Sequence, residues 1–384
     1  MRPFPVIGFA PRLAALYAAL FLMLGMQLPF FPVWLRAKGL DAQMIGIVLA
    51  IPMLVRVFAI PVAARAADRH DALRAVIVGA SCASVVGYVL TALSGGAAAI
   101  VATYALASLA FTPVMPLTET YALRGLGARG RAYGPVRLWG SAAFIAGNFA
   151  AGFAADAMPP RELIWLIVVA LAVNALAAFA LLPLASAAPP EARARSSLLR
   201  DPAFIAVLAA AALIQSSHAV YYGFSALAWS AAGLDGTAIA ALWALGVVAE
   251  ILLFAVSGRL PPFFTPLVMI MTGAAGAALR WTAMAFDPPA LLLPWLQLLH
   301  GLSFGAAFLG ALNFVAHRAP PGQGATAQGH LAVASGVVMA AAMGASGLLY
   351  AAFGVRAYAA MALAAVAGGA CALVAYQLGR RAPF

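Results

Sequence analysis

Apolar residues along the chain fall into long runs that are separated by short polar breaks. A helix needs about 20 predominantly apolar residues to cross the hydrocarbon core of a bilayer. Twelve runs of this length are present, at approximately residues 13–35, 43–64, 75–94, 97–122, 134–155, 161–183, 203–226, 236–257, 264–286, 289–316, 329–350 and 355–378. The pattern predicts an all-α integral membrane protein with twelve transmembrane helices.

The longest break between runs covers residues 184–202, which include Pro189, Pro190 and several charged side chains. Six runs lie on each side of it. We therefore predict two pseudo-symmetric six-helix bundles, residues 1–183 and 203–384, joined by a cytoplasmic linker at residues 184–202.

A weak internal repeat supports this division. When the chain is shifted by about 194 residues, Gly147 and Gly152 fall close to Gly344 and Gly347. Many secondary transporters are built from duplicated halves of this kind.

Composition agrees with a membrane setting. Apolar residues make up 65% of the chain and charged residues only 9%, against roughly 45–50% and about 25% in soluble proteins. A net charge of +11 would suggest nucleic-acid binding in a soluble protein, but here the basic residues lie mainly in the short breaks. Cys82 and Cys371 each lie alone in an apolar run and there is no CxxC, so we expect neither a metal nor a redox site.

Basic residues predict the orientation, because loops on the cytoplasmic side carry an excess of Lys and Arg. With the N-terminus placed inside, sixteen of the 22 basic residues fall on the cytoplasmic side, four fall outside and two lie within spans. We therefore expect both termini to face the cytoplasm. The first run, about 22 residues long, exceeds the 7–15 residues of a signal-peptide core, so we interpret it as a retained span.

Two short motifs suggest enzymes but lack the required context. Residues 125–130 match GxGxxG after a membrane helix rather than a strand, and residues 301–305 match GxSxG inside a predicted span. We interpret the first as a basic loop and the second as helix packing through small residues. An enzyme would have to use Glu119, Glu250, His218 and His300, which no spacing assembles into a known site, so we predict that the chain is not an enzyme.

Polar side chains inside the apolar runs are the candidate functional residues. A charged group at the centre of a span costs roughly 2.5–3.5 kcal/mol, so such groups usually face an interior cavity and find partners. The set consists of Arg56, Glu119, Arg137, Trp139, Asn148, Gln215, His218, Glu250, Arg280, Gln297 and His300. The charges of Arg56 and Arg280 can be balanced by those of Glu119 and Glu250, and the sequence leaves open which pairs form.

Each candidate also has a structural interpretation. Glu119 and Arg137 lie near predicted cytoplasmic ends and could reach water. Glu250 and Arg280 could form a purely structural ion pair. Asn148 could hold neighbouring helices together, and His300 and the aromatic residues could serve packing alone.

Three passages carry a family resemblance that extends over almost the whole chain. The first, residues 64–74 between the second and third runs, contains Asp68 and Arg69, followed by Arg74. It resembles the cytoplasmic G-x-x-x-D-R-x-G-R-R motif of the major facilitator superfamily, with Ala64 in place of the first Gly. In the family this loop latches helices during the conformational cycle. The resemblance assigns that role to Asp68, Arg69 and Arg74.

The second passage is Y-G-P-V-R-L-W-G-S at residues 133–141, with Glu119 eighteen residues before Arg137. It is similar to the phenylpropionate permeases, and lactose permease pairs a glutamate and an arginine at the same spacing to hold sugar. The third passage holds His300 twenty residues after Arg280, a spacing also similar to lactose permease. Ser303 stands where that family has its proton-carrying glutamate, so any coupled proton must use Glu250, His300 or Glu119.

The resemblance implies two bundles around a central cavity and proton-coupled import of a small organic solute, with an aromatic carboxylate such as 3-phenylpropionate as the leading class. Arg56, Arg137 and Arg280 can each engage a carboxylate, and Trp139 or Tyr221 can stack on its ring. The expected substrate contacts are Arg56, Glu119, Arg137, Trp139, Asn148, Gln215, His218, Tyr221 and Gln297. The expected proton-coupling residues are Glu250, Arg280 and His300.

Alternative interpretations are a sugar or nucleoside proton symporter, with Glu119 and Arg137 on substrate hydroxyls, and a multidrug efflux antiporter. A lipid-binding or sensor protein stays open as a non-transporting class. We expect a monomer in the bacterial inner membrane, with a small-molecule substrate and a proton as partners, and with no cofactor, metal or nucleic acid.

Overall fold

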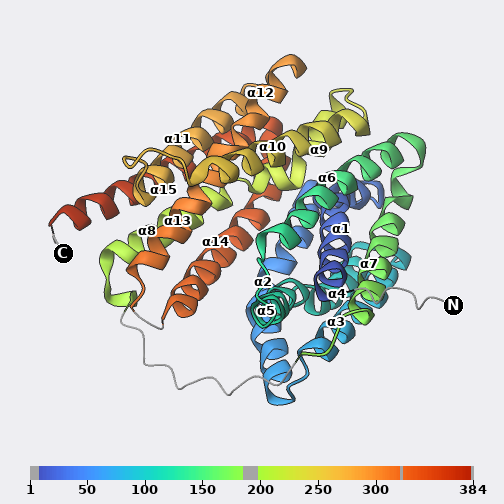
Figure 1. Cartoon of the computed structure of the whole chain (residues 1–384). Coiled ribbons are helices and arrows are strands. Elements are labelled where there is room, and N and C mark those ends of the chain that lie inside the picture. The colour runs from blue at the N-terminus through green and yellow to red at the C-terminus, as the bar shows by residue number, and fades with distance from the viewer. Residues whose placement is uncertain (1–7, 185–197, 321–322, 382–384) are drawn as a thin grey trace. The chain divides into compact units, whose positions relative to one another are not determined.

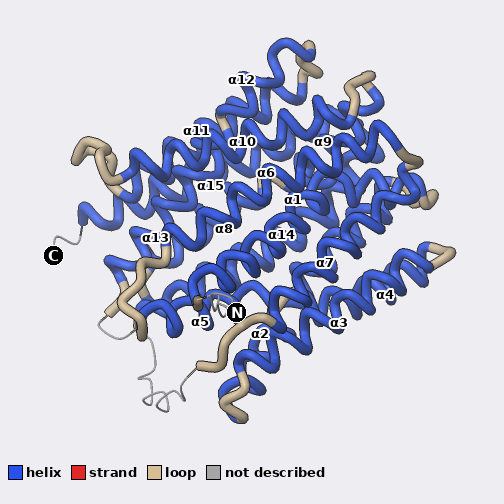
Figure 2. Tube along the Cα trace, turned by 45° about the vertical axis from the view of Figure 1, so that its right-hand side comes forward, coloured by secondary structure: helices blue, strands red, loops and turns tan. Residues whose placement is uncertain are grey.

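The computed structural model describes residues 8–184, 198–320 and 323–381 (Figure 1). Residues 185–197, which make up most of the predicted linker, lie outside the described residues. The described chain consists of helices and connecting loops, and no strand occurs in it (Figure 2).

The helices before the linker follow the predicted apolar runs closely. They are α1 (Phe9–Ala37), α2 (Ala42–Arg69), α3 (Leu73–Leu93), α4 (Ala97–Phe111), α5 (Val114–Gly127), α6 (Gly134–Ala157), the short η1 (Pro160–Glu162) and α7 (Leu163–Phe179).

The helices after the linker do the same. They are η2 (Leu198–Arg200), α8 (Pro202–Ser216), α9 (Ala219–Ala231), α10 (Gly236–Ser257), α11 (Pro266–Ala285), η3 (Ala290–Leu292), α12 (Leu293–Leu298), η4 (Gly301–Ala306), α13 (Ala307–Arg318), α14 (Gly324–Phe353), η5 (Gly354–Ala357) and α15 (Tyr358–Arg381).

Eleven helical stretches in the described chain are long and apolar enough to cross a membrane. The last of them, Thr326–Leu378, is 53 residues long and contains both α14 and α15, so it has the length of two crossings. The prediction of an all-α membrane protein with twelve spans is therefore confirmed.

Contacts divide the chain into two compact units. The first unit holds α1, α3 to α7, α2 from Leu54 onward, and the segment Trp229–Ala241. The second unit holds the segment Asp41–Met53, α8, α9 up to Ala228, and the chain from Leu242 onward. In the first unit α1 packs against both α6 and α7, and in the second α15 packs against α8 and α11 (Figure 1).

Three of the predicted spans are broken near their middle. The fourth is interrupted between α4 and α5, the seventh between α8 and α9, and the tenth between α12 and α13, where η4 is a π-helix. A break of this kind frees backbone groups that must be satisfied inside the protein, because lipid offers them no partner. At the break in the seventh span, the Ser217 hydroxyl donates to the carbonyl of Ile214 (2.6 Å).

Glycines let α1 and α6 approach closely. A Cβ added at Gly25 would lie 2.1 Å from the carbonyl oxygen of Phe144, and one added at Gly147 would lie 2.2 Å from that of Leu22. Helix pairs in membranes use small residues in this way, so that backbones can pack at short range. The close contact fixes where α6 crosses α1.

Two glycines of the sequence repeat have equivalent surroundings. A Cβ at Gly152 in α6 would lie 2.6 Å from the carbonyl of Gly236 at the start of α10, within the first unit. A Cβ at Gly347 in α14 would lie 2.5 Å from the carbonyl of Ala42 at the start of α2, within the second unit. The repeat is incomplete, because a Cβ at Gly344 would meet nothing within 4 Å.

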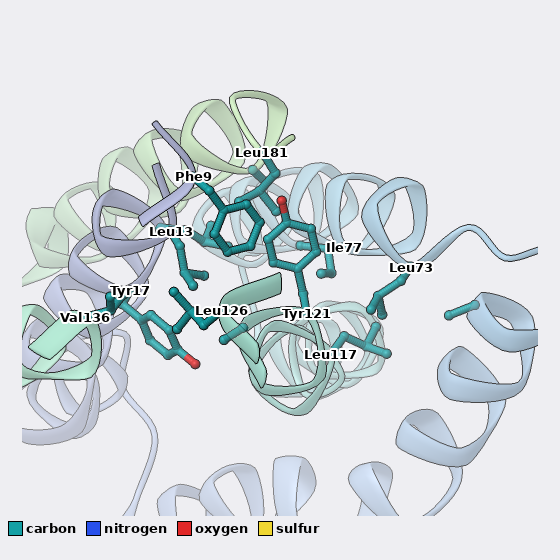
Figure 3. Close-up of a cluster of buried hydrophobic side chains, with 14 residues drawn as sticks. Phe9, Leu13, Tyr17, Leu73, Ile77, Leu117, Tyr121, Leu126, Val136 and Leu181 are labelled. Carbon is teal, nitrogen blue, oxygen red and sulfur yellow. The ribbon is translucent and has the colours of Figure 1, made fainter. Parts of the chain in front are cut away.

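A buried apolar cluster fills one end of the first unit (Figure 3). Phe9 stacks on Tyr121 with ring centroids 5.3 Å apart, and Arg129 lies over the Phe9 ring at 4.2 Å. Around this cluster, three side chains donate to carbonyls at the end of α7: Arg12 to residue 180, Arg74 to residues 179 and 181, and Tyr121 to residue 182. These bonds satisfy carbonyls that the helix itself leaves without partners.

We predict that Gly147→Ala destabilises the protein by about 1–3 kcal/mol, because the new methyl group would collide with the backbone of α1. Thermal unfolding in detergent measures the effect. Gly79→Ala is the matched control, since its Cβ would meet nothing within 4 Å in the middle of α3; the control is expected to be neutral or to stabilise by up to about 1 kcal/mol. Equal melting temperatures for the two variants would contradict the packing argument.

A second stability prediction concerns Asp201, which caps α8 by accepting from the backbone N–H of Ala203 (3.0 Å) and from Arg318 Nε (2.5 Å). Burial acts to raise the pKa of Asp201, but these two hydrogen bonds outweigh it and hold the pKa below the ordinary value. Because the folded-state pKa is lowered, the stabilisation is present above the unfolded pKa of about 3.9 and is lost as pH falls through the lower folded value.

Asp201→Ala should therefore lower stability by about 1–2 kcal/mol at neutral pH, with a difference from wild type that shrinks below about pH 4. Glu162→Gln, an exposed change in η1, is the control and should leave the unfolding curve unchanged at both pH values. A difference for Asp201→Ala that did not vary with pH would contradict the role of its charge.

Candidate functional site

The structure gathers most of the predicted polar residues into two clusters, one in each unit. The Arg280 cluster, in the second unit, consists of His218, Tyr221, Glu250, Arg280, Gln297, His300 and Ser303. The Glu119 cluster, in the first unit, consists of Tyr17, Glu119, Tyr133 and Arg137.

Arg280 lies on α11, and its side chain is fully buried. Its Nη2 donates to Gln297 Oε1 (2.5 Å), and its Nη1 donates to His300 Nδ1 (3.0 Å) and at longer range to Ser303 Oγ (3.4 Å). All three acceptors are neutral. None of the ion pairs between described side chains includes Arg280, so its charge is held by polar groups and aromatic rings.

The aromatic rings beside Arg280 contribute cation–π attraction. The guanidinium carbon lies 4.6 Å from the ring centroid of Tyr221 and 4.5 Å from that of Trp281. Tyr221 in turn stacks on Trp243 at 4.6 Å, and Trp281 stacks on Tyr358 at 5.6 Å. A desolvated cation over an aromatic face gains about 2 kcal/mol, which partly offsets the cost of burial.

The bond from Arg280 fixes the proton of His300. A guanidinium can only donate, so His300 Nδ1 must be the acceptor and the ring proton must sit on Nε2. His300 Nε2 lies 3.9 Å from Glu250 Oε2. In this arrangement a proton that arrives at Nδ1 breaks the bond to Arg280 and creates a cation beside Glu250.

Ser303 links Arg280 to His218. His218 Nδ1 lies 3.2 Å from two backbone carbonyls, those of Ile214 and Gln215, so this nitrogen carries the proton. His218 Nε2, at 3.2 Å from Ser303 Oγ, is then the acceptor of the Ser303 hydroxyl. Ser303 stands at the position where lactose permease has an acidic proton carrier. Here the residue is neutral and bridges Arg280 and His218.

Several donors around Arg280 are buried and have no hydrogen-bond partner among the described residues. They are Arg280 Nε, Gln297 Nε2, Trp243 Nε1 and Tyr358 OH. Buried donors usually have a partner, so these four atoms keep unused hydrogen-bonding capacity.

The π-helix η4 shapes this cluster. It begins one residue after His300 and contains Ser303. Its glycines pack on α10, because a Cβ at Gly301 would lie 2.9 Å from the carbonyl of Ala249 and one at Gly305 would lie 3.5 Å from Glu250 Cγ. The GxSxG match is therefore a helix-packing element, as predicted. Single-turn π-helices occur often at functional sites.

The Glu119 cluster is half-buried and contains a direct ion pair. Arg137 Nε lies 3.7 Å from Glu119 Oε1, and the guanidinium lies 4.0 Å from the ring centroid of Phe21. The Tyr133 hydroxyl donates a short hydrogen bond to Glu119 Oε2. Burial, followed by this bond to a carboxylate, raises the pKa of Tyr133 to about 12, so Tyr133 remains a donor at physiological pH.

Four further predicted contacts are not members of the two clusters as defined above. Asn148 is buried where α1 crosses α6 and donates to the carbonyl of Phe144 (3.4 Å), a helix-packing position. Gln215 donates to the carbonyl of residue 304 (3.4 Å) at the edge of the Arg280 cluster. Arg56 is half-buried on α2, and Trp139 is 62% exposed on α6.

The residues of the predicted latch lie at one end of the first unit. Asp68 pairs with Arg124 at 3.7 Å on the surface. Arg74 donates to the carbonyls of Phe179 (2.8 Å) and Leu181 (2.7 Å) and so caps α7. Arg69 is the last residue of α2.

Sequence reasoning missed Tyr17 of the Glu119 cluster and two aromatic residues beside Arg280, Trp281 and Tyr358. In the sequence all three look like ordinary aromatic residues of an apolar span, although Trp281 directly follows Arg280. Tyr133 was part of the quoted motif, but its contact with Glu119 depends on the turn before α6. No periodicity signal would have selected Tyr17 or Tyr358, because their partners lie on other helices.

Comparison with known proteins gives a consistent family. A family model described as the MFS_1 like family matches residues 11–360. A protein of Escherichia coli (strain K12) described as a probable 3-phenylpropionic acid transporter is 33% identical over 321 residues, which cover 80% of this chain and 82% of that protein. The maltose permease of Geobacillus stearothermophilus is 28% identical over 312 residues, or 79% of this chain and 78% of the permease.

Solved structures agree on the fold. The crystal structure of the nucleoside transporter NupG superposes with a TM-score of 0.81 at 16% identity and covers 98% of this chain and 100% of the transporter. The D-xylose-proton symporter gives a TM-score of 0.69 at 11% identity, covering 96% and 97%. These relatives and neighbours are membrane transporters and not enzymes.

The geometry of the Arg280 cluster yields a stability prediction. Gln297→Ala removes the acceptor of Arg280 Nη2 and leaves a buried charged donor without a partner, so we expect a loss of about 1–3 kcal/mol. Gln297→Glu keeps an acceptor at the same place and supplies a negative charge, and it should unfold at a temperature at or above that of wild type. Thermal unfolding of the detergent-solubilised protein measures both. A Gln297→Glu variant as unstable as Gln297→Ala would contradict this account of Arg280.

Proposed function

Because the chain belongs to the major facilitator superfamily of membrane transporters, we propose that it is a secondary active transporter that imports an aromatic carboxylate, of the 3-phenylpropionate type, together with a proton. Superfamily membership and the multi-pass membrane setting are the established premises. The substrate, the proton and the direction of transport are the proposal.

The observation that carries the proposal is the fully buried Arg280, whose hydrogen bonds to Gln297 and His300 go to neutral acceptors and whose guanidinium lies over two aromatic rings. A buried charge needs compensation. A substrate carboxylate supplies it, and the unused donors Arg280 Nε and Gln297 Nε2 can accept it by charge-assisted hydrogen bonds. An uncharged substrate could accept from those donors but would supply no negative charge to the buried guanidinium.

Aromatic side chains beside Arg280 are suited to contact the phenyl ring of the proposed substrate. Tyr221 and Trp243 lie stacked beside Arg280 at 4.6 Å. A phenyl ring that enters between or beside them replaces one aromatic contact with another, at little cost. The E. coli relative, described as a probable 3-phenylpropionic acid transporter, agrees with this assignment.

His300 and Glu250 would couple the proton to the substrate. In the proposed cycle, a proton taken up at His300 Nδ1 breaks the bond to Arg280 and frees one guanidinium N–H for the substrate. The imidazolium is then stabilised by Glu250, 3.9 Å from His300 Nε2. Substrate and proton thus favour each other's binding, as symport requires.

A second candidate function is sugar symport. The Glu119 cluster presents a carboxylate, a guanidinium and a tyrosine hydroxyl close together, a combination that suits hydroxyl groups. The similarity to a maltose permease favours this alternative. In the aromatic carboxylate proposal Glu119, Arg137, Trp139, Arg56, Asn148, Gln215 and His218 remain predicted substrate contacts.

The proposed setting is the bacterial inner membrane, with both termini in the cytoplasm and the protein acting as a monomer. The basic bias of the loops supports this orientation. In this setting Asp68, Arg69 and Arg74 lie on the cytoplasmic side, where the superfamily latch acts, and Arg124 would be the partner of Asp68.

Uptake of labelled 3-phenylpropionate into proteoliposomes tests the proposal. We expect accumulation that requires an inward proton gradient and is abolished by a protonophore. Arg280→Gln should abolish binding and uptake, whereas Glu250→Gln should abolish gradient-driven accumulation and retain exchange of internal for external substrate, because only the proton step is lost.

The controls separate the alternatives. Glu162→Gln, on the exposed η1, should transport like wild type. 3-Phenylpropanol, which lacks the carboxylate, should not compete, and maltose should not compete either. Gradient-driven uptake that survives Glu250→Gln would remove the proton assignment, and competition by maltose but not by phenylpropionate would favour the sugar symporter.

A further inference from the structure

A groove on the first unit lies outside both clusters. Its volume is about 710 Å³. Its floor is one face of α1, with Ala14 and Ala18, and its wall is the start of α6, with Pro135 and Trp139. Arg131, in the loop before α6, stands at its mouth.

The polar and apolar ends of this groove are separated along the helix axis. Arg131 precedes the first residue of α6, and Trp139 lies five residues into that helix, a distance of about 8 Å at 1.5 Å per residue. The predicted orientation of the spans therefore places Arg131 at the level of the headgroups and Trp139, whose side chain is 62% exposed, further along the span. Trp residues commonly lie at this level.

The charge at the mouth is available to a ligand. None of the ion pairs between described side chains includes Arg131, and its side chain is exposed. The N-terminus of α6, one turn away, has no side-chain cap, so the positive end of its dipole adds to the same field. Both features attract an anion, whereas the alanine-lined floor suits an alkyl chain.

We propose that this groove binds an anionic phospholipid, with the phosphate on Arg131 and one acyl chain lying over Ala14 and Ala18 beside Trp139. A guanidinium can hold a phosphate through two parallel hydrogen bonds. Phosphatidylcholine has the same phosphate, but its ammonium group offsets the negative charge, so Arg131 favours a lipid with a net negative charge. One basic residue near the membrane surface corresponds to a preference of about fivefold for an anionic headgroup. The groove contains no residue of the Arg280 or Glu119 cluster, but Trp139, a predicted substrate contact, would here lie against the lipid chain instead.

Brominated lipids test the proposal, because bromine on an acyl chain quenches the fluorescence of a tryptophan in contact with it. The protein is reconstituted in phosphatidylcholine vesicles with increasing fractions of brominated phosphatidylglycerol, or of brominated phosphatidylcholine. The quenching that wild type shows and Trp139→Phe lacks belongs to Trp139. We expect this Trp139 quenching to reach half its maximum at a fraction of brominated phosphatidylglycerol about fivefold lower than that of brominated phosphatidylcholine.

Two variants locate the site. Arg131→Gln should remove the preference for phosphatidylglycerol and leave the total quenching unchanged, whereas Arg259→Gln, another exposed arginine, should keep the preference. Ala14→Leu with Ala18→Leu fills the groove and should remove the saturable component. Arg131 is a surface residue, so its variant keeps the test decisive if the double variant fails to fold.

Equal quenching by the two brominated lipids in wild type would overturn the proposal, because it would mean that ordinary boundary lipid covers Trp139. An unchanged preference in Arg131→Gln would overturn it as well. Relief of Trp139 quenching by 3-phenylpropionate, without any difference between the lipids, would show instead that the groove is a substrate surface.

Discussion

A bilayer provides no hydrogen-bond partner for the backbone, and this constraint governs where the helices of the protein end and break. At the end of α7, the carbonyls of residues 179–182 accept from Arg12, Arg74 and Tyr121. At the break in the seventh span, His218 bonds the freed carbonyls. Polar side chains at helix ends and breaks therefore complete the hydrogen bonding of the backbone.

The same constraint explains how Arg280 is held. Its neighbours Gln297 and His300 lie on the tenth span, and the break that η4 introduces directly after His300 coincides with the place where these side chains meet α11. A single carboxylate would have compensated the charge more strongly. Neutral acceptors leave the guanidinium able to exchange partners, which a transporter that binds and releases an anion requires.

Much of the fold could be predicted from the sequence, because apolar runs of about 20 residues have the length that a helix needs to cross a bilayer. The twelve spans were predicted from this length criterion alone. The π-helix and the breaks within spans could not be predicted, since they depend on contacts between helices. The spacing of Glu119 and Arg137, which resembles a pair in lactose permease, corresponds to an ion pair in the structure. For Arg280, charge balance allowed Glu250 or Glu119, and the observed acceptors are Gln297, His300 and Ser303, because the facing residue is set by the crossing of α11 with the tenth span.

The direction of the hydrogen bonds through Ser303 has a consequence for the two histidines. Arg280 donates to Ser303, Ser303 donates to His218, and His218 donates to the backbone. His300 accepts from Arg280 on the other side, and its ring centroid lies 5.5 Å from that of His218. Because Arg280 donates toward both His300 and Ser303 and cannot accept a proton, these bonds form no proton path between the two rings. A charge on one ring is therefore felt by the other only through space. Protonation of one histidine should therefore lower the proton affinity of the other without transferring a proton to it.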